Sequence, residues 1–542
     1  MADDRIGRAS VFLASGTIVS RVLGFVKAIV LANAIGLVGS GSADAFAVAN
    51  QLPNTIYVVV AGGVLSAVLV PQIVRAGLHD DGGHAYINRL LTLSLVLLAL
   101  ATVAATLAAP LFTLLYGTQL SSETRDLATI FAYWCLPQIF FYGLYTLLGE
   151  VLNARRSFGP FTWVPVLNNV VAIAGLFVFM ALYGADPNGE RSPGAWDFSM
   201  IAILAGSATL GIAAQAIVLF WFWRRIGLRY RPDFRWRGVG LGDAGRMASW
   251  TFGMLLLTTF AGIVETNVVG IASGEGASVA ALGNAWLIFM LPHSVITVSI
   301  ATAYFTRMSE HASVGDTDKV RTDVSSAIRG VSLIIVLAAI VLAMCAYPFA
   351  TVFTGEASFD SRLAFGNVIA AYVVGLVPFS FLFIVQRAFY ALGDTKTPFF
   401  FTLFQVVLFS SGALLLVNVA IDWIAMGIAL LTSVATLAQV VLATVLLRRK
   451  LGELDGWRIT TSFVRYTIAA VPSLVVGFMV LVSLGGLSST GFAMSGIAPA
   501  VISMVAIGVA MAVVYFGVLW LIRSPELHGF ARPLLDRVTR RR

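Results

Sequence analysis

Two cations stand in an apolar stretch near the N-terminus, "SRVLGFVKAI", which contains Arg21 and Lys27. A cation at the centre of a membrane helix costs about 2.5–3.5 kcal/mol, so both side chains require water, a partner or an anion. Six positions separate them, which places them about 120° apart around a helix, within reach of one wide cavity. We therefore expect an anion site, with phosphate or pyrophosphate as the preferred ligand.

Local charge pairing is the alternative explanation for these cations. Asp44 and Glu150 each lie close enough to the ends of predicted spans to neutralise one cation, and Lys27 could extend toward the membrane surface. Pairing of Asp44 with one cation still leaves the other to be explained.

The helices that position these charges are predicted from composition. The chain has 542 residues, of which 58% are hydrophobic and 11% charged, and its mean hydropathy is +0.89. We predict an all-α polytopic membrane protein without a cleavable signal peptide. About fourteen transmembrane helices are expected, at 10–35, 44–74, 88–116, 126–152, 161–183, 199–222, 247–272, 279–306, 328–354, 363–391, 398–418, 423–447, 463–485 and 496–522.

The basic residues orient these spans. With both termini in the cytoplasm, the only Lys or Arg residues in the external loops are Arg125, Arg191 and Arg362. The excess of basic residues behind the net charge of +8 is then explained by their concentration in cytoplasmic segments, where they can also contact anionic membrane lipids. No nucleic-acid partner is expected.

Prolines and glycines recur across the middle of the chain. Pro110 and Pro348 differ by 238 positions, as do Gly117 and Gly355, and Pro160 and Pro398. We predict two parallel six-helix repeats plus two C-terminal helices, a plan common among secondary transporters. The expected parts are an N-terminal lobe (1–223), a basic cytoplasmic linker (224–246), a C-terminal lobe (247–450), two additional helices (451–522) and a basic cytoplasmic tail (523–542).

Three further residue pairs bear on function. Pro53 and Pro292, offset by 239 positions, would bend their helices and are predicted gates. Glu265 and Asn267 could bind Na⁺ or a proton, or form a hydrogen-bonded pair near the outer face. Cys135 and Cys345 fall in apolar segments and predict neither a disulfide nor a metal site.

The segments "SRVLGFVKAIVLANAIG", "SADAFAVANQLPN" and "FYALGDTKTPF" resemble the MurJ/MviN family, within the multidrug/oligosaccharidyl-lipid/polysaccharide exporter superfamily. The resemblance extends over essentially the whole chain. It implies a bacterial cell-membrane flippase for lipid II, the undecaprenyl-pyrophosphate-linked peptidoglycan precursor, working by alternating access. It also implies that Arg21 and Lys27 meet the pyrophosphate and that Asp44, Pro53 and Asn54 belong to the same motif; we add Glu150 to the predicted substrate site.

The sequence departs from the family at several charged positions. Tyr57 and Val58 replace a basic pair, Leu287 replaces another basic residue, and Ala28 replaces an acid. Asn267 matches the family's cation-binding position, but span eleven offers only Gln405 and serines as further ligands. Na⁺, a proton or the membrane potential alone could therefore drive transport, and no cofactor is expected.

Other functions fit parts of this pattern. A flippase for another polyprenyl-linked polysaccharide, a drug antiporter, and a non-transporting scaffold that recruits cell-wall enzymes are alternatives. A membrane enzyme would need a site such as "HDDGGH" at 79–84, which has the composition of a solvated turn. The two intramembrane cations favour a transporter over a scaffold.

Overall fold

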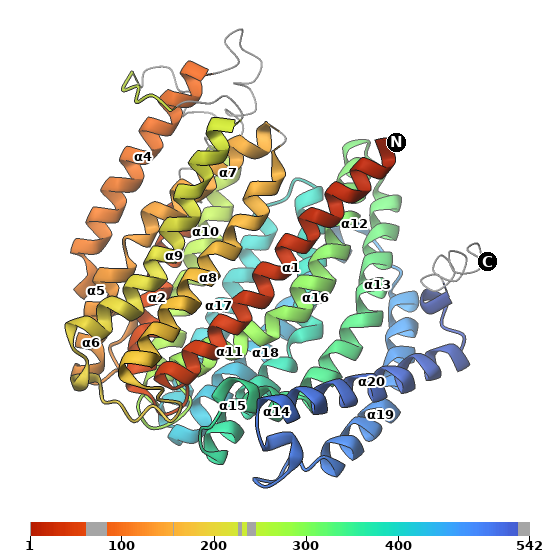
Figure 1. The fold of residues 1–542 in the computed structure, drawn as a ribbon. Coiled ribbons are helices and arrows are strands. Elements are labelled where there is room, and N and C mark those ends of the chain that lie inside the picture. Colours follow the sequence, from red (N-terminus) through yellow and green to blue (C-terminus); the bar gives the residue numbers. More distant parts are fainter. Residues whose placement is uncertain (1, 61–83, 156, 226–229, 236–244, 529–542) are drawn as a thin grey trace. The chain divides into compact units, whose positions relative to one another are not determined.

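The computed structural model describes residues 2–60, 84–155, 157–225, 230–235 and 245–528, and its regular elements are helices (Figure 1). Thirteen helical segments in these ranges are long and apolar enough to cross a membrane. The predicted all-α membrane class is confirmed. The expected second span, 44–74, begins as α2 (Gly41–Val60), and its remainder lies outside the described residues, so fourteen spans stay a prediction.

The contacts divide the chain into two compact units, Met1–Glu275 and Gly276–Arg542. Helix α10 (Gly245–Gly270) packs on α2 and α5 of the first unit, although the repeat predicts that it begins the second lobe. The predicted five-part division follows the repeat rather than these contacts, and it stays a prediction.

The first unit is built from helices that pack in pairs, α1 with α8, α8 with α9, and α2 with α6. A leucine-rich core that includes Leu148 and Trp223 lies among α4, α7, α8 and α9. Besides α2 and α10, its helices are α1 (Ala2–Ile35), α4 (His84–Leu107), α5 (Ala109–Tyr116), α6 (Ser122–Cys135), α7 (Gln138–Ala154), α8 (Phe158–Tyr183), the short η2 (Pro193–Ala195) and α9 (Phe198–Arg225).

In the second unit, α19 and α20 run side by side and pack on α13 (Figure 1). Tyr466 and Tyr515 fill this contact and donate hydrogen bonds to backbone carbonyls of α13. The elements are α11 (Val279–Pro292), the π turn η3 (His293–Thr297), α12 (Val298–Ser313), α13 (Thr317–Met344), α14 (Ala346–Thr354), α15 (Phe359–Val373), α16 (Leu376–Ala391), α17 (Lys396–Leu415), η4 (Leu416–Asn418), α18 (Ile421–Leu451), α19 (Gly456–Ser483), η5 (Phe492–Met494) and α20 (Ile497–Leu521).

The internal repeat is visible as matched helix breaks. Pro110 lies at the start of α5, where the third span breaks, and Pro348 lies in α14, just after the corresponding break. A second break separates α6 from α7 in the first unit and α15 from α16 in the second. A break in a helix leaves backbone carbonyls without their helical partners. Each freed carbonyl therefore needs another hydrogen-bond donor.

A hydroxyl from a crossing helix supplies that donor in both units. Thr209 Oγ1 donates to the Trp134 carbonyl over 2.7 Å. Ser433 Oγ, which has one proton to donate, lies within hydrogen-bond distance of the carbonyls of Ala371 (2.9 Å), Tyr372 (3.2 Å) and, on its own helix, Ala429 (3.1 Å). Trp134 and Tyr372 differ by the same 238 positions as the prolines. The repeat therefore extends from sequence spacing to the way each break is stabilised.

The described part of the basic linker, residues 230–235, is held against α4. Asp233 accepts hydrogen bonds from Arg235 and from Arg89 Nε (3.0 Å), and its backbone amide donates to Thr92 Oγ1 over 3.0 Å. The hydrogen bonds from Arg235, ahead of that from Arg89, hold the pKa of the half-buried Asp233 carboxyl below its usual range. Asp233 therefore holds residues 230–235 of the linker against α4.

Asp233→Ala is expected to free residues 230–235 from α4, because Arg89 and Arg235 lose their shared partner. Trypsin should then cleave after Arg235 several-fold faster in the purified protein. Asp318→Ala, which removes an exposed acid from the start of α13, is the control. Equal cleavage rates in wild type and Asp233→Ala would show that the linker is held by other contacts.

The segment "ALGDTKTPF" joins α16 to α17 through Asp394. Its carboxylate accepts hydrogen bonds from Thr397 N and Oγ1 over 2.9 and 2.7 Å and pairs with Lys450 Nζ over 2.7 Å. Burial raises the pKa of Asp394, but the hydrogen bonds from Lys450 and Thr397 outweigh it, so the pKa is lowered. The motif thus ties the end of α18 to the start of α17.

This pKa shift predicts a pH dependence of stability. Because the folded pKa lies below the unfolded value of about 3.9, the stabilisation is complete above that value and is lost as pH falls toward the folded pKa. Acidification from pH 7 to below 4 should therefore lower the melting temperature of wild type more than that of Asp394→Asn. Parallel melting curves for the two proteins would contradict this.

Candidate functional site

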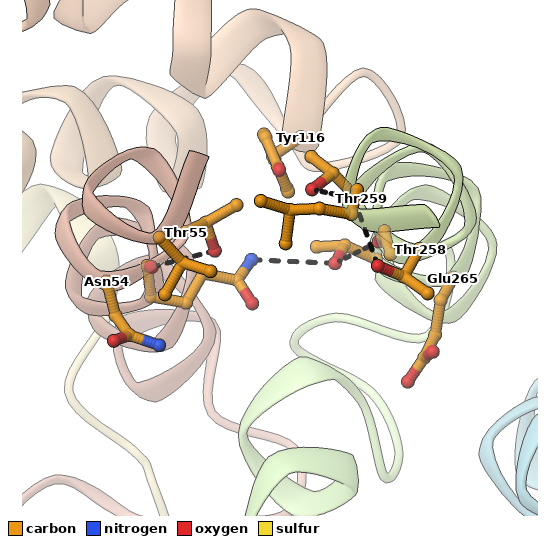
Figure 2. A pocket seen from close by; sticks show the side chains of 11 residues that line it. Asn54, Thr55, Tyr116, Thr258, Thr259 and Glu265 are labelled. Carbon is orange, nitrogen blue, oxygen red and sulfur yellow. Dashed lines mark hydrogen bonds between the residues drawn. The ribbon is translucent and has the colours of Figure 1, made fainter. Parts of the chain in front are cut away.

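A polar pocket of about 330 Å³ opens between α2, α5 and α10 of the first unit (Figure 2). Asn54 and Thr55 lie on one side of it, and Thr258, Thr259 and Glu265 lie on the other. We call it the α2–α10 pocket; its lining residues are Gln51, Asn54, Thr55, Val58, Tyr116, Leu255, Thr258, Thr259, Gly262, Glu265 and Thr266.

Helical spacing creates both walls of this pocket. On α2, lining residues stand at 51, 54, 55 and 58, which is the spacing of one helix face. On α10, they stand at 255, 258, 259, 262, 265 and 266, again on one face. Of this set, only Asn54 and Glu265 were predicted as site residues, although the polar residues that recur at helical spacing around Gln51 and Thr258 could have predicted the others.

The hydroxyl groups in the pocket mostly donate to their own helices. Thr55 donates to the Gln51 carbonyl over 3.1 Å, while Thr258 and Thr259 both donate to the Leu255 carbonyl over 3.0 and 2.8 Å. One contact bridges the walls: Gln51 Nε2 donates to Thr266 Oγ1 over 3.5 Å. The pocket therefore offers mainly hydroxyl oxygens as acceptors.

Lys27 lines a second, smaller pocket of about 80 Å³ in the same unit. This Lys27 pocket lies among α1, α2, α7, α8 and α9, and its other polar lining residues are Asn50, Tyr142, Asn168 and Ser207. Asn50, Tyr142 and Asn168 can donate hydrogen bonds into the pocket, whereas Ser207 already donates to the Leu204 carbonyl over 3.1 Å. Since the described lining contains no acidic residue, the Lys27 pocket suits an anionic group.

Arg21 does not join Lys27 there. Its side chain is exposed on α1, and Arg21 is not among the residues that line either pocket. The structure therefore separates the two predicted pyrophosphate contacts, as their offset around the helix allows.

Asp44 lies in the first turn of α2 and is only 1% exposed. Its Oδ2 accepts a hydrogen bond from Ser273 Oγ, just beyond α10, over 2.7 Å. Nearby, Ser42 accepts a hydrogen bond from Trp196 Nε1 and donates to the Arg191 carbonyl, each over 2.8 Å. A substrate could reach Asp44 only if this end of the unit opened, and its substrate role stays a prediction.

Tyr57 of α2 faces α7, the helix that contains Glu150. Tyr57 donates a hydrogen bond to Thr146 Oγ1 over 2.7 Å, and Glu150, one turn further along α7, is half-buried. Val58 lines the α2–α10 pocket and Leu287 is 38% exposed on α11. Three neutral side chains thus stand where the family resemblance predicts basic ones.

The two predicted gating prolines lie in different settings. Pro53 is inside α2, whereas Pro292 ends α11 and is followed by the π turn His293–Thr297. π turns inside helices occur frequently at functional sites. Gating at both prolines stays a prediction.

The structure does not bring Glu265 and Asn267 together in one site. Two helical positions place them about 160° apart around α10, so Glu265 lines the α2–α10 pocket while Asn267 faces α5. The Asn267 amide oxygen accepts hydrogen bonds from Thr118 N and Oγ1, and its nitrogen donates to the carbonyls of Leu115 and Ile263 over 2.7 and 2.9 Å. This geometry favours a structural role for Asn267 and leaves Glu265 as the cation-binding candidate.

Asn267→Ala should therefore lower the melting temperature, because it leaves Thr118 and the Leu115 carbonyl without their partner. A lost pair of such bonds costs about 1–3 kcal/mol. Transport by the remaining folded protein should keep its original Na⁺ and pH dependence. A changed ion dependence at unchanged stability would instead support the predicted role of Asn267 in cation binding.

Potential metal ligands and thiols can be placed for the part of the chain that the structure covers. No group of three or more His, Cys, Asp or Glu side chains there is arranged to hold a metal ion. Cys135 and Cys345 are buried free thiols. The "HDDGGH" segment at 79–84, apart from its last residue, lies outside the described residues.

Membrane-spanning helices, repeated helix breaks and polar pockets among the helices of the first unit define the class of multi-pass membrane transporters. The family described as "Lipid II flippase MurJ" matches residues 31–498, and the chain belongs to this family. A probable lipid II flippase MurJ from Rhizobium tropici is 26% identical over 482 residues, covering 86% of this chain and 84% of the relative. One from Thermotoga maritima is also 26% identical, over 79% of this chain and 83% of the relative.

Solved structures show the same fold. The chain resembles "Lipid II flippase MurJ, inward closed conformation" with a TM-score of 0.70 and 17% identity, covering 94% of this chain and 99% of the other. It also resembles an inward-facing multidrug resistance MATE transporter of the MOP superfamily, with a TM-score of 0.62, 17% identity and coverage of 81% and 96%. The predicted family and fold are confirmed.

Proposed function

We propose that this chain moves lipid II from the inner to the outer leaflet of the bacterial cell membrane, as a transporter and not an enzyme. The observation that carries this proposal is membership of the lipid II flippase family over residues 31–498. The Lys27 pocket supports it independently, since a half-buried ammonium group beside the donors Asn50, Tyr142 and Asn168 suits a pyrophosphate.

Alternating access is the mechanism that this fold supports. A flippase must expose its polar site to each side in turn, so helices that can bend are needed. Pro53 in α2 and Pro292 before the π turn are the candidate bending points, one in each unit. Both termini in the cytoplasm fit the distribution of Lys and Arg along the chain.

Energy coupling would involve Glu265. Its carboxylate is the acidic group that lines the α2–α10 pocket and could bind Na⁺ or a proton during the cycle. The membrane potential alone is the alternative, and an ion gradient imposed across proteoliposomes distinguishes the two.

The decisive experiment measures lipid II accessible at the outer leaflet of cells depleted of this protein. Depletion should trap lipid II inside, and wild-type protein should restore external lipid II. Unchanged external lipid II after depletion would contradict the proposal. In that case a flippase for another polyprenyl-linked glycan, or a scaffold for cell-wall enzymes, becomes the better explanation.

The second candidate function, transport of another polyprenyl-linked glycan, has one specific observation in its favour. Tyr57, Val58 and Leu287 remove positive charge that the family resemblance predicts, so the headgroup bound here could carry less negative charge than lipid II.

A further inference from the structure

The second unit contains a cavity of about 580 Å³ that the proposed transport mechanism does not use. It lies where α18 and the start of α19 meet α13 and α16, and we call it the α18–α19 cavity. Its volume is within the range of pockets that hold small organic ligands. Its large apolar lining residues are Ile328, Phe381, Val385, Leu454 and Ile459.

The α18–α19 cavity lies where two membrane-spanning helices reach the membrane surface. The apolar run of α18 ends in three basic residues, 448–450, and α19 begins at Gly456 after a short connection. Trp457, in the first turn of α19, lines the cavity and is strongly exposed. Trp and basic side chains are common where membrane helices meet lipid headgroups. The polar rim of the cavity therefore stands at headgroup level, beside an apolar lining that suits acyl chains.

One cation and one anion face the cavity. Arg448 Nη2 and Glu453 Oε1 are 3.6 Å apart, and their side chains are 66% and 87% exposed. Such an exposed ion pair is weak, so each group can take a second partner. These are the two charged residues in the described lining, which is therefore neutral overall. An anionic headgroup would be repelled by Glu453 and a cationic one by Arg448, so a headgroup that carries both charges is the better match.

The order of the two charges also fits such a headgroup. In a zwitterionic phospholipid the phosphate adjoins the glycerol that bears the chains, and the ammonium group is outermost. Arg448, the less exposed of the pair, would take the phosphate, and Glu453 would take the ammonium group. Thr444, one turn before Arg448 on α18, adds a hydroxyl group to the lining.

A primary ammonium group suits Glu453 better than a quaternary one. A primary ammonium has three N–H donors for a carboxylate, whereas a quaternary ammonium has none and is recognised by cages of aromatic rings. We infer that the α18–α19 cavity binds a zwitterionic phospholipid with a primary ammonium headgroup, as a resident membrane lipid and not as the transported substrate. This inference does not rest on the proposed function.

The test measures lipid binding to the full-length protein in detergent by native mass spectrometry. The probes are dioleoyl phosphatidylethanolamine, phosphatidylcholine and phosphatidylglycerol, which share their chains, and undecaprenyl pyrophosphate. We expect wild type to bind phosphatidylethanolamine about tenfold more tightly than the other three lipids. Glu453→Gln should lose this preference without weaker binding of phosphatidylglycerol. Arg448→Gln should bind all three phospholipids more weakly, because each of them carries the phosphate.

Arg458→Gln is the matched control, because Arg458 lies at the same end of α19 and pairs with Asp455 over 4.0 Å but does not line the cavity. Its affinities should equal those of wild type. Since the substituted side chains are exposed, melting temperatures near the wild-type value should verify that the variants fold.

Tighter wild-type binding of phosphatidylglycerol or undecaprenyl pyrophosphate than of phosphatidylethanolamine would overturn the inference, because the site would then select anions. An unchanged lipid preference in folded Glu453→Gln would also overturn it, as would equal losses in Arg448→Gln and Arg458→Gln. None of these results bears on lipid II export, which is measured separately in depleted cells.

Discussion

Cells that depend on this chain are expected to stop presenting lipid II at the outer leaflet when Lys27 is replaced by Met. Methionine has a similar length but no charge, so the Lys27 pocket keeps its shape and loses its ammonium group. A hydrogen bond to a charged group is worth about 1.5–3 kcal/mol, which corresponds to roughly tenfold to hundredfold weaker binding. External lipid II, measured after depletion of the wild-type protein, reports the loss.

Three variants separate charge from fold in this experiment. Lys27→Arg retains the positive charge and should retain part of the transport. Lys319→Met removes an exposed lysine that pairs with Asp316 at the start of α13 and should behave as wild type. Membrane levels of each variant show whether it is made and inserted. Normal export by Lys27→Met at normal levels would exclude Lys27 from the substrate path.

The sequence predicted this residue because a buried cation is costly in any membrane helix. The same reasoning weighted Arg21 equally, yet Arg21 is exposed while Lys27 lines a pocket. The free-energy cost of a cation in a membrane helix is the same for Arg21 and Lys27, so it could not predict which of them lines a pocket. That depends on which face of α1 packs against the neighbouring helices α2, α7, α8 and α9. That information lies in tertiary packing rather than in the spacing of two charges.

The helix breaks were more accessible from sequence than the pockets. Proline restricts the backbone wherever it occurs, so Pro110 and Pro348 mark their breaks directly. Thr209 and Ser433, which satisfy the freed carbonyls, come from helices far along the chain. Their hydroxyls resemble many others in the sequence, and only the folded arrangement assigns them this role.

The predicted joint cation site was wrong for a different reason, because closeness in sequence was taken as closeness in space. Glu265 and Asn267 are near neighbours in sequence and almost opposite on α10, so sequence proximity suggested a joint site that helical geometry separates. The polar stripe from Leu255 to Thr266 follows the helical period and could have been predicted, together with its counterpart on α2. Thus periodicity, rather than adjacency, carried the information about the α2–α10 pocket.

The second large effect is expected at Asp44, where Asp44→Ala should both destabilise the protein and reduce lipid II export. The substitution removes the partner of Ser273 at a position that is 1% exposed. Loss of a buried hydrogen bond to a charged group, with its donor left unsatisfied, costs about 1–3 kcal/mol. Melting temperature and external lipid II are measured on the same variant.

Asp44→Asn distinguishes the hydrogen bond from the charge. Asparagine can still accept from Ser273 Oγ but carries no charge, so we expect nearly wild-type stability and export well above that of Asp44→Ala. Asp318→Ala, at an exposed acid whose side chain is 82% accessible, should change neither quantity. If Asp44→Asn is as stable as wild type but exports no lipid II, the negative charge itself is required. The tie between α2 and the segment after α10 would then be secondary, and the predicted place of Asp44 in the substrate site would gain support.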